Sequence, residues 1–547
     1  MVVRPLAGCA GDGRHRADRR RRAVADAART RGISGFFFYP GFEATLASEL
    51  HDLVYWRQRA QSIVPSLRGQ AYIDGKWTDA ADGATFDSID PATGTVLAKV
   101  AACGEADVDR AVAAARRAFE QGVWAAMPRR ERKATLLRLA ALIEQHREEL
   151  ALLETLDMGK PIADTLLYDI PESARTYAWY AEAIDKIYDE IAPTDANVLA
   201  TITREPLGVV AAVVPWNYPL LMASWKVAPA LAVGNSVVLK PAEQSPLSAL
   251  RLAALAEEAG IPAGVFNVVP GIGAQAGQAL GRHSDVDCIA FTGSTATGKR
   301  FLEYAGQSNL KRVWLECGGK SPHIVFDDCP DLDRAAQAAA IGIFNNQGEI
   351  CIAGSRLYVQ RGIYDAFMAK LEACAANMQP GDPLDPASAM GAIVDARQLD
   401  RVMSYVAAGQ REGARLRLGG QRVRADSGGY FLQPTIFECP AQSLSIVREE
   451  IFGPVLAVTV FDTEEEALRM ANDSPYGLGS GLWTANLARA HRVSRQLRAG
   501  LVWVNCYMDG DITVPFGGVK QSGSGRDKSL HALDKYTDLK TTWISLA

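Results

Sequence analysis

One cysteine in this 547-residue sequence stands in a setting that favours nucleophilic chemistry. Cys351 lies in the segment FNNQGEICIAGSR (residues 344–356), between a stretch with helical periodicity and a strand-like run. The flanking Gly348 and Gly354 would let backbone amides approach a substrate closely. A thiol with an ordinary pKa of about 8.5 is only a few per cent ionised at neutral pH, so a nucleophilic cysteine needs a favourable field or a nearby base. On composition alone a structural cysteine is the more common case, and other motifs must decide.

A carboxylate that could serve as the base precedes a double glycine. Glu316 lies in the segment LECGGKSP (residues 315–322), where we expect a turn between domains. A positioned Glu can accept a proton from water or from a thiol. The alternative is a solvated turn carboxylate, which is common beside glycines. The adjacent Cys317 is interpreted as a packing residue.

An uncharged amide donor lies between two prolines in VPWNYPL (residues 214–220). The prolines restrict the backbone around Asn217, whose side-chain amide could stabilise an oxyanion. Such a donor is typically worth about 2.7 to 4 kcal/mol in the transition state. Without the other motifs, an Asx turn would be the better interpretation.

Three further motifs could hold a phosphorylated coenzyme. FTGSTATGK (residues 291–299) combines the end of a strand, a glycine loop and the start of a helix, an arrangement that favours binding of an anion. As a general pattern it is weak, because it is neither GxGxxG nor a P-loop. In VLKPAEQSP (residues 238–246), Lys240 and Glu243 could meet an adenosine ribose, and the carboxylate would favour NAD over NADP. In EEIFGPV (residues 449–455), Glu450 and Phe452 could hold a nicotinamide ribose and ring. Ordinary surface charge remains the alternative for each acidic motif.

Length and composition limit the scaffold that must position these residues. The chain is 48% hydrophobic and 22% charged with a formal net charge of −5, which describes a soluble globular protein with at least two domains. A basic excess that would indicate nucleic acid is absent from the sequence, as is an apolar run of the roughly 18 residues that a membrane helix needs. The nine cysteines include no CxxC pair, so we expect neither a disulfide framework nor a metal cluster, and a reducing cytoplasm fits best.

Hydrophobic patterning predicts alternating helices and short strands. The segment 107–119 reads as a helix and the segments 209–214 and 236–239 as strands, and a second alternating run includes residues 323–326, 356–359 and 503–505. This alternation predicts an α/β fold with two mostly parallel sheets. Residues 1–43 are rich in arginine and poor in apolar pattern, which predicts a disordered extension; a mitochondrial transit peptide or a start codon assigned too far upstream are the alternatives.

Two segments look like an arm that projects from the domains. Residues 187–206 contain turn formers followed by a β-branched run, and residues 537–545 near the C-terminus are strand-like. Exposed edge strands of this kind pair readily with a partner subunit. We therefore expect a homo-oligomer.

Taken together, the six motifs occur in the order found in the aldehyde dehydrogenase superfamily, and the chain resembles that family from about residue 60 to its C-terminus. The resemblance implies that Cys351 is the nucleophile, Glu316 the general base and Asn217 the oxyanion donor. It also implies NAD, with NADP as the alternative, and no catalytic metal. The implied coenzyme contacts are Trp216, Lys240, Glu243, Gly293, Ser294, Glu450 and Phe452.

The resemblance also implies a domain plan. A Rossmann-like coenzyme domain is expected over residues 44–186 and 207–318, with residues 509–532 returning to it. A catalytic domain is expected over 319–508, and a β-hairpin oligomerisation arm over 187–206 and 533–547. The family forms dimers or tetramers. Cys317 departs from the family pattern of Leu, Met or Ala, which should change packing beside Glu316 without removing the carboxylate.

Within the superfamily, the chain resembles bacterial enzymes that oxidise γ-glutamyl-γ-aminobutyraldehyde or guanidinobutyraldehyde in polyamine and arginine breakdown. The likeness includes LETLDMGKP (residues 153–161), residues 180–187 and GRDKSLHAL (residues 525–533). Asp509 and Asp511 could attract a cationic tail, although an acidic surface turn is an equal alternative. The implied aldehyde channel is lined by Tyr218, Leu221, Trp225 and Phe516.

Other activities remain as alternatives to this substrate. A broad-specificity aldehyde dehydrogenase without polyamine preference is the main one. A CoA-acylating enzyme would transfer the thioester to CoA, whereas an intact Glu316 favours hydrolysis. A non-catalytic descendant would be expected to lose Cys351 or Glu316, and this chain keeps both.

Overall fold

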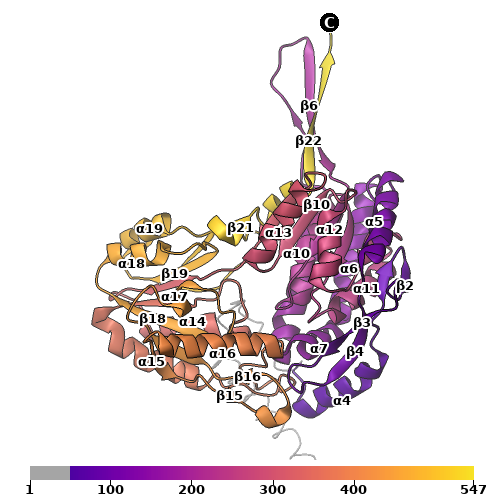
Figure 1. The fold of residues 1–547 in the computed structure, drawn as a ribbon. Helices are drawn as coiled ribbons and strands as arrows, with labels where there is room; N and C mark the ends of the chain where they lie inside the picture. The colour runs from indigo at the N-terminus through magenta and orange to yellow at the C-terminus, as the bar shows by residue number, and fades with distance from the viewer. Residues whose placement is uncertain (1–49) are drawn as a thin grey trace, which may run out of the picture.

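The computed structural model describes residues 50–547, so the extension predicted over residues 1–43 lies outside the described residues. Two α/β lobes lie side by side, and a long β-sheet arm projects from one of them (Figure 1). The lobe carrying the arm contains an eight-stranded sheet, and the other contains a seven-stranded sheet. The predicted α/β class and mostly parallel sheets are confirmed.

The eight-stranded sheet has five parallel strands at its centre, in the order β9-β8-β7-β10-β11. Antiparallel strands complete both edges, and the last of them comes from near the C-terminus. Its strands are β1 (Ala71–Ile73), β2 (Lys76–Thr78), β7 (Val209–Val213), β8 (Ser236–Lys240), β9 (Phe266–Val268), β10 (Cys288–Thr292), β11 (Arg312–Glu316) and β21 (Gly523–Ser524). The hairpin of β3 (Thr85–Ile89) and β4 (Val96–Ala101) lies outside this sheet.

Helices cover both faces of this sheet because its central strands are apolar on both sides. Val210 and Ala212 of β7 pack into a core with α6, α9, α10 and α11, whereas Val209 and Ala211 face α5, α12 and α13. Such two-sided burial is typical of parallel sheets. The helices of this lobe are α4 (Leu53–Ile63), α5 (Glu105–Glu120), α6 (Arg129–Gln145), α7 (Arg147–Met158), α8 (Ile162–Asp164), α9 (Ile170–Ala183), α10 (Pro219–Ala232), α11 (Leu247–Ala259), α12 (Gln278–Arg282) and α13 (Thr295–Gly306).

The seven-stranded sheet is parallel except at β14, in the order β14-β17-β18-β13-β12-β19-β20. Its strands are β12 (Pro322–Val325), β13 (Arg356–Gln360), β14 (Arg415–Leu418), β17 (Thr435–Glu438), β18 (Val455–Phe461), β19 (Gly479–Trp483) and β20 (Leu501–Val504). A short hairpin joins β15 (Arg422–Val423) to β16 (Phe431–Leu432). The helices are α14 (Leu332–Phe344), α15 (Tyr364–Ala376), α16 (Ala396–Arg411), α17 (Ser445–Arg448), α18 (Glu464–Asn472) and α19 (Leu487–Gln496).

The arm is a separate three-stranded antiparallel sheet. Its strands are β5 (Glu190–Ile191), β6 (Val198–Pro206) and β22 (Thr537–Ser545), in the order β22-β6-β5. Thr537 pairs with Pro206 and Ser545 with Val198, so β6 and β22, one from each predicted arm segment, pair along their whole length. The predicted domain boundaries at 187, 207, 319, 509 and 533 fall between the strands of the three sheets.

No helix in residues 50–547 is long and apolar enough to cross a membrane.

Candidate active site

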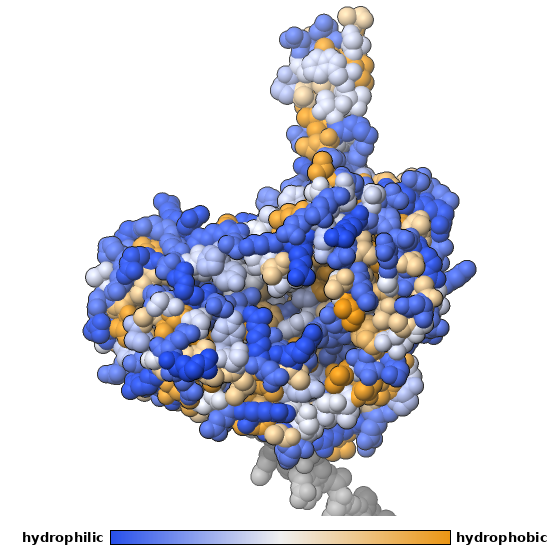
Figure 2. All heavy atoms as spheres, in the orientation of Figure 1, coloured by the Kyte–Doolittle hydropathy of each residue, from blue (hydrophilic) through white to orange (hydrophobic). Residues whose placement is uncertain are grey.

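A cavity of about 270 Å³ lies between the two lobes, at the carboxyl ends of β7, β10 and β11. Parallel sheets commonly bind ligands at this edge. On the face shown in Figure 2, the surface is hollowed between the lobes. The walls of this cavity bring together residues from six separate parts of the sequence: Trp216 with Asn217, and Gly293, Cys317, Cys351, Phe452 and Phe516.

Cys351 is held in the cavity by an unusual turn. Three successive residues before it, Asn346, Gln347 and Gly348, have left-handed φ values of 45°, 56° and 72°. Such a run is rare for residues other than glycine and is found where the fold fixes a functional loop. A Cβ on Gly348 would come within 2.3 Å of the Gly453 carbonyl oxygen, so the site requires glycine there. The loop therefore places the thiol at the wall between the lobes.

Asn217 connects the end of β7 to the cysteine loop. Its side-chain amide donates to the Glu349 carbonyl at 2.7 Å, and Asn346 donates to the Asn217 carbonyl at 3.1 Å. An amide group has two N–H donors, so one remains for an oxyanion beside Cys351. This geometry supports the predicted role of Asn217.

The Cys351 thiol is difficult to ionise in this environment. Burial raises its pKa to about 12, and the carboxylates of Glu450 and Glu316 add to the increase. A raised pKa lowers the thiolate fraction, so a base or a positive charge is needed to form the nucleophile. The nearby carboxylates are candidates for that base.

Glu316 is the last residue of β11 and is buried. Neither of its carboxylate oxygens has a hydrogen-bond partner among residues 50–547. Burial raises its pKa well above the ordinary range, and the negative charge of Asp527 raises it further. Cys317 and Gly318 line the cavity but the Glu316 carboxyl group does not; it lies beside Gly517, where a Cβ would come within 2.6 Å of Oε1. The alternative interpretation of Glu316 as a solvated turn carboxylate is wrong, because its side chain is buried.

A buried ion cluster that the sequence analysis did not identify lies near Glu316. Asp527 accepts from the ammonium groups of both Lys226 and Lys535. All three side chains are almost completely buried. The two lysines lower the Glu316 pKa, which partly offsets the effects of burial and Asp527. Asp527 is 301 residues from Lys226 in the sequence, so no local pattern joins them.

The residues predicted to hold pyrophosphate lie at the start of a regular helix. Ser294 is the N-cap of α13, with its hydroxyl accepting from the Thr297 N–H, and Gly293 and Ser294 both line the cavity. A Cβ on Gly293 would lie 2.5 Å from the Phe291 ring. A helix N-terminus behind a glycine is suited to a phosphate group. The residues present therefore fit the predicted coenzyme.

The predicted ribose contacts are partly engaged with each other. Lys240 ends β8, donates to the Pro241 carbonyl at 2.7 Å, and lies 3.7 Å from the Glu243 carboxylate. Neither residue is in the wall of the cavity described above. At the other end of the coenzyme motifs, Glu450 accepts from the Gly319 N–H at 2.8 Å, and the Trp216 and Phe452 rings meet edge to face at 5.2 Å. These last three residues line the cavity.

The predicted aldehyde channel is aromatic. Tyr218, Leu221, Trp225 and Phe516 all line the cavity, and the Trp225 and Phe516 rings lie 5.0 Å apart. The Lys160 ammonium lies 3.5 Å from the centre of the Tyr218 ring, and Lys160 also pairs with the buried Asp169. This support fixes the ring from behind, away from the cavity.

The structure separates the two aspartates predicted at the channel mouth. Asp509 lines the cavity, and its backbone carbonyl accepts from the Trp503 indole at 2.7 Å. Asp511 is not among the lining residues, because its carboxylate pairs with Arg175 at 2.6 Å. Three charged residues that the sequence analysis did not assign to the site also line the cavity, namely Glu172, Arg401 and Lys528.

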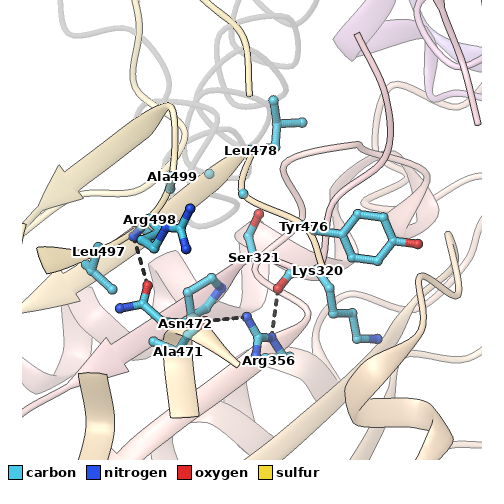
Figure 3. Close-up of a pocket in the computed structure, with 14 residues that line it drawn as sticks. Lys320, Ser321, Arg356, Ala471, Asn472, Tyr476, Leu478, Leu497, Arg498 and Ala499 are labelled. Carbon is cyan, nitrogen blue, oxygen red and sulfur yellow. Dashed lines mark hydrogen bonds between the residues drawn. The ribbon is translucent and has the colours of Figure 1, made fainter. Parts of the chain in front are cut away.

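A second pocket lies behind the segment that follows Glu316 (Figure 3). Arg356 lines this pocket, and its guanidinium donates to the Lys320 carbonyl at 2.7 Å and to the Ala471 carbonyl at 2.9 Å. The space amounts to about 10 Å³, which suits about one water molecule. We interpret this pocket as structural support, since Arg356 ties the start of β12 to the end of α18.

Comparisons with known proteins agree with this geometry. A family model described as "Aldehyde dehydrogenase family" matches residues 77–542. The chain is 58% identical to the NADP/NAD-dependent aldehyde dehydrogenase PuuC of Escherichia coli (strain K12) over 496 residues, which cover 91% of this chain and 99% of that protein.

Two solved structures are similar over the same length. A γ-glutamyl-γ-aminobutyraldehyde dehydrogenase from Burkholderia cenocepacia J2315 is 62% identical with a TM-score of 0.89, covering 91% of this chain and 100% of that one. An indole-3-acetaldehyde dehydrogenase from P. syringae, in complex with NAD+ and IAA, is 57% identical with a TM-score of 0.90 and the same coverage.

Proposed function

Because the chain belongs to the aldehyde dehydrogenase family, we propose that its substrate is an aldehyde with a charged tail, of the γ-glutamyl-γ-aminobutyraldehyde or guanidinobutyraldehyde type. The enzyme is an NAD(P)-dependent aldehyde dehydrogenase, which oxidises an aldehyde to a carboxylic acid. The observation that carries the substrate proposal is the 62% identity, over 91% of this chain, to a γ-glutamyl-γ-aminobutyraldehyde dehydrogenase. A cavity wall containing both Cys351 and Asp509 supports it.

The first half of the proposed mechanism forms a covalent bond to Cys351. The thiol gives its proton to a base, for which the nearby carboxylates of Glu316 and Glu450 are the candidates. The sulfur then adds to the carbonyl carbon while the carbonyl π electrons move to oxygen. The free N–H of Asn217 and the backbone N–H of Cys351 stabilise the resulting oxyanion. Bound NAD(P)+ supplies the hydride acceptor that converts the thiohemiacetal to a thioester. Trp216, Gly293, Ser294, Glu450 and Phe452 would hold the coenzyme, with Lys240 and Glu243 at its adenosine ribose.

The second half releases the acid. Glu316 accepts a proton from water, whose oxygen attacks the thioester carbonyl; the carbon–sulfur bond then breaks and the Cys351 thiolate leaves. The carboxylate of Glu316 must turn from Gly517 toward the cavity to reach this water. Burial raises the pKa of the Glu316 carboxyl group, which makes its carboxylate form a stronger proton acceptor.

The arm supports a proposal about assembly. Trp543 and Leu539 of β22 are 65% and 58% exposed, and apolar side chains are visible along the arm in Figure 2. The outer edge of β22 has no neighbouring strand in residues 50–547. We propose that this edge and these side chains pair with a second copy of the chain in a homodimer or homotetramer. We also propose that the enzyme is cytoplasmic.

Initial rates of NADH formation test the substrate proposal. The panel contains γ-glutamyl-γ-aminobutyraldehyde, guanidinobutyraldehyde, betaine aldehyde, indole-3-acetaldehyde and propanal, with wild type and Cys351→Ala. We expect a preference of at least about tenfold in kcat/KM for the first two aldehydes, and no activity in Cys351→Ala. Similar values across the panel would favour the broad-specificity alternative. Undiminished activity in Cys351→Ala would overturn the proposed nucleophile.

A further inference from the structure

Two residues of opposite charge line the cavity on the substrate side, from distant parts of the chain. Glu172 belongs to the first turn of α9, and Lys528 follows β21. The largest charge effects on the Cys351 thiol come from Glu450 and Glu316, not from this pair. The charges that act on the pKa of Lys528, after the larger effect of burial, are those of Glu172, Asp511 and Arg175. The pair therefore forms an electrostatic group separate from the nucleophile.

The Lys528 ammonium is held in place without an ionic partner. It makes no hydrogen bond or ion pair within residues 50–547, and it lies 5.5 Å from the centre of the Trp225 ring. Lys528 and Ser529 both have left-handed φ values, 60° and 49°, and the Ser529 N–H donates to the Ile512 carbonyl at 2.7 Å. A Cβ on Gly510 would lie 3.4 Å from the ammonium. The backbone thus directs a cation with unused donors toward the cavity.

Two carboxylates, those of Glu172 and Asp509, line the same cavity as that ammonium. Glu172 is about one-fifth exposed and accepts from Arg175 at 3.3 Å. Burial lowers the pKa of Lys528, and the negative charge of Glu172 opposes that change. Asp509 lies in the same wall, next to Gly510. A purely cationic tail would be attracted by the two carboxylates and repelled by Lys528. A tail with both an ammonium and a carboxylate would satisfy all of these groups.

We propose that Lys528 and Glu172 form a two-charge site for a zwitterionic tail, in which Lys528 binds the α-carboxylate and Glu172 the α-ammonium. This inference rests on the proposed function and narrows it to aldehydes that end in a free α-amino acid group. The γ-glutamyl aldehyde has such a tail, whereas the guanidino aldehyde has only the cation. Trp225, beneath Lys528, contacts the alkyl part of the substrate.

Steady-state kinetics with three aldehydes test the site. These are γ-glutamyl-γ-aminobutyraldehyde (zwitterionic tail), guanidinobutyraldehyde (cationic tail) and butanal (no charge). In Lys528→Gln, we expect kcat/KM to fall about 10- to 100-fold for the zwitterion, the range of a lost charge-assisted hydrogen bond. We expect it to rise for the cation, because repulsion is removed, and to stay within about twofold for butanal. Lys528→Arg should restore most of the zwitterion rate.

Two further variants complete the design. Glu172→Gln should lower kcat/KM for both charged aldehydes about tenfold while sparing butanal. Lys76→Gln removes an exposed lysine on β2 and controls for a change in net charge; it should leave all three values unchanged.

The outcomes separate this inference from the proposed function. If wild type prefers the γ-glutamyl aldehyde and Lys528→Gln keeps that preference, the two-charge site is wrong and the proposed function stands. An equal loss for all three aldehydes would assign Lys528 a structural role and overturn the site. Wild type that does not discriminate between the zwitterion and butanal would overturn both.

Discussion

At the residue scale, the charge state of the Glu316 carboxyl group is subject to two opposing demands, burial and the general-base role proposed for it. Burial without a hydrogen-bond partner disfavours its charged form, whereas general-base chemistry requires that form. The cluster of Lys226, Asp527 and Lys535 sets the balance, because the two lysines favour ionisation and Asp527 opposes it. A carboxyl group poised in this way can take a proton from water and lose it again within one turnover.

Replacing the Glu316 carboxylate should separate the two halves of the reaction. We expect Glu316→Gln to release a burst of NADH of about one equivalent per site, followed by a steady rate reduced about 10²- to 10⁴-fold, because acid release needs the base. Rapid-mixing absorbance at 340 nm measures the burst. Cys317→Ala, a change at the neighbouring packing residue, should keep the steady rate. If Glu316→Gln abolishes the burst as well, Glu316 is also the base for the thiol.

The raised pKa values of Glu316 and Cys351 predict a pH dependence with a definite sign. Both groups act in their deprotonated forms, and burial raises both pKa values, so the active fraction grows as the pH rises. The enzyme should be slow at pH 6 and reach its highest kcat above pH 8. Rates at constant ionic strength from pH 6 to pH 10 measure this. A rate that is flat, or that falls as the pH rises, would contradict the assignment of both groups.

At the element scale, the turn before Cys351 couples the cysteine to the loop that carries Phe452. Gly348 meets the Gly453 carbonyl, and Phe452 itself has a positive φ of 60°. The two loops, both with left-handed backbone, therefore pack directly against each other. The position of the Cys351 thiol relative to Phe452 depends on both loops.

Gly348→Ala should therefore harm activity more than it harms stability. The new Cβ would force the loops apart, and a displacement of about 1 Å at a reacting group can cost about 100-fold in rate. The matched control is Gly362→Ala, at an exposed position where a Cβ meets nothing within 4 Å. Comparison of kcat and urea unfolding midpoints for the two variants checks this. Equal activities would show that the turn is not needed to place the thiol.

The elements also show which features a sequence can disclose. The strands at β7, β8, β12 and β13 were predicted within about two residues, since their apolar runs are local signals. Pairing of β6 with β22 along nine residues was not foreseen, although both segments were assigned to the arm. Pairing is a long-range property that neither segment encodes alone.

The same limit applies to the site. Cys351, Asn217 and Gly293 belong to recognisable motifs, and the structure brings them to one cavity. Lys528 and Glu172 lie outside those motifs, and only the fold unites them. Asp511 was a candidate substrate contact because its carboxylate could attract a cationic tail. Its pairing with Arg175 depends on a helix 336 residues away, which the local sequence does not show.

At the scale of the whole molecule, the strand β22 of the arm has almost none of its side chains buried against its own lobe. Apart from Thr537, every residue of β22 is exposed, and its side chains include Trp543 and Ile544. Exposed apolar strands are costly unless a partner covers them. The proposed oligomer would remove that cost.

Deleting residues 537–547 should lower the assembly state. Removal of β22 exposes one edge of β6 and takes away the apolar residues proposed to meet a second subunit. Light scattering coupled to size exclusion should show the full-length chain as a dimer or tetramer and the deletion as smaller or aggregated. The milder variant Trp543→Arg, which keeps the strand, should weaken assembly in dilution series. A variant series with unchanged mass would assign the interface to another surface.

The pairing of β22 with β6 has a consequence for biosynthesis. Lys540 and Glu205, which pair across these strands, are 335 residues apart, and β21 likewise completes the edge of a sheet begun far earlier. At about 5 to 20 residues per second, a ribosome needs roughly 20 to 70 s to supply the second partner after the first has emerged. Until then the nascent chain displays an unpaired strand edge at β6, and a second one at β11 from the time β11 emerges until β21 follows. A chaperone that shields strand edges would therefore raise the yield, and a stalled or prematurely terminated message would yield an aggregation-prone product.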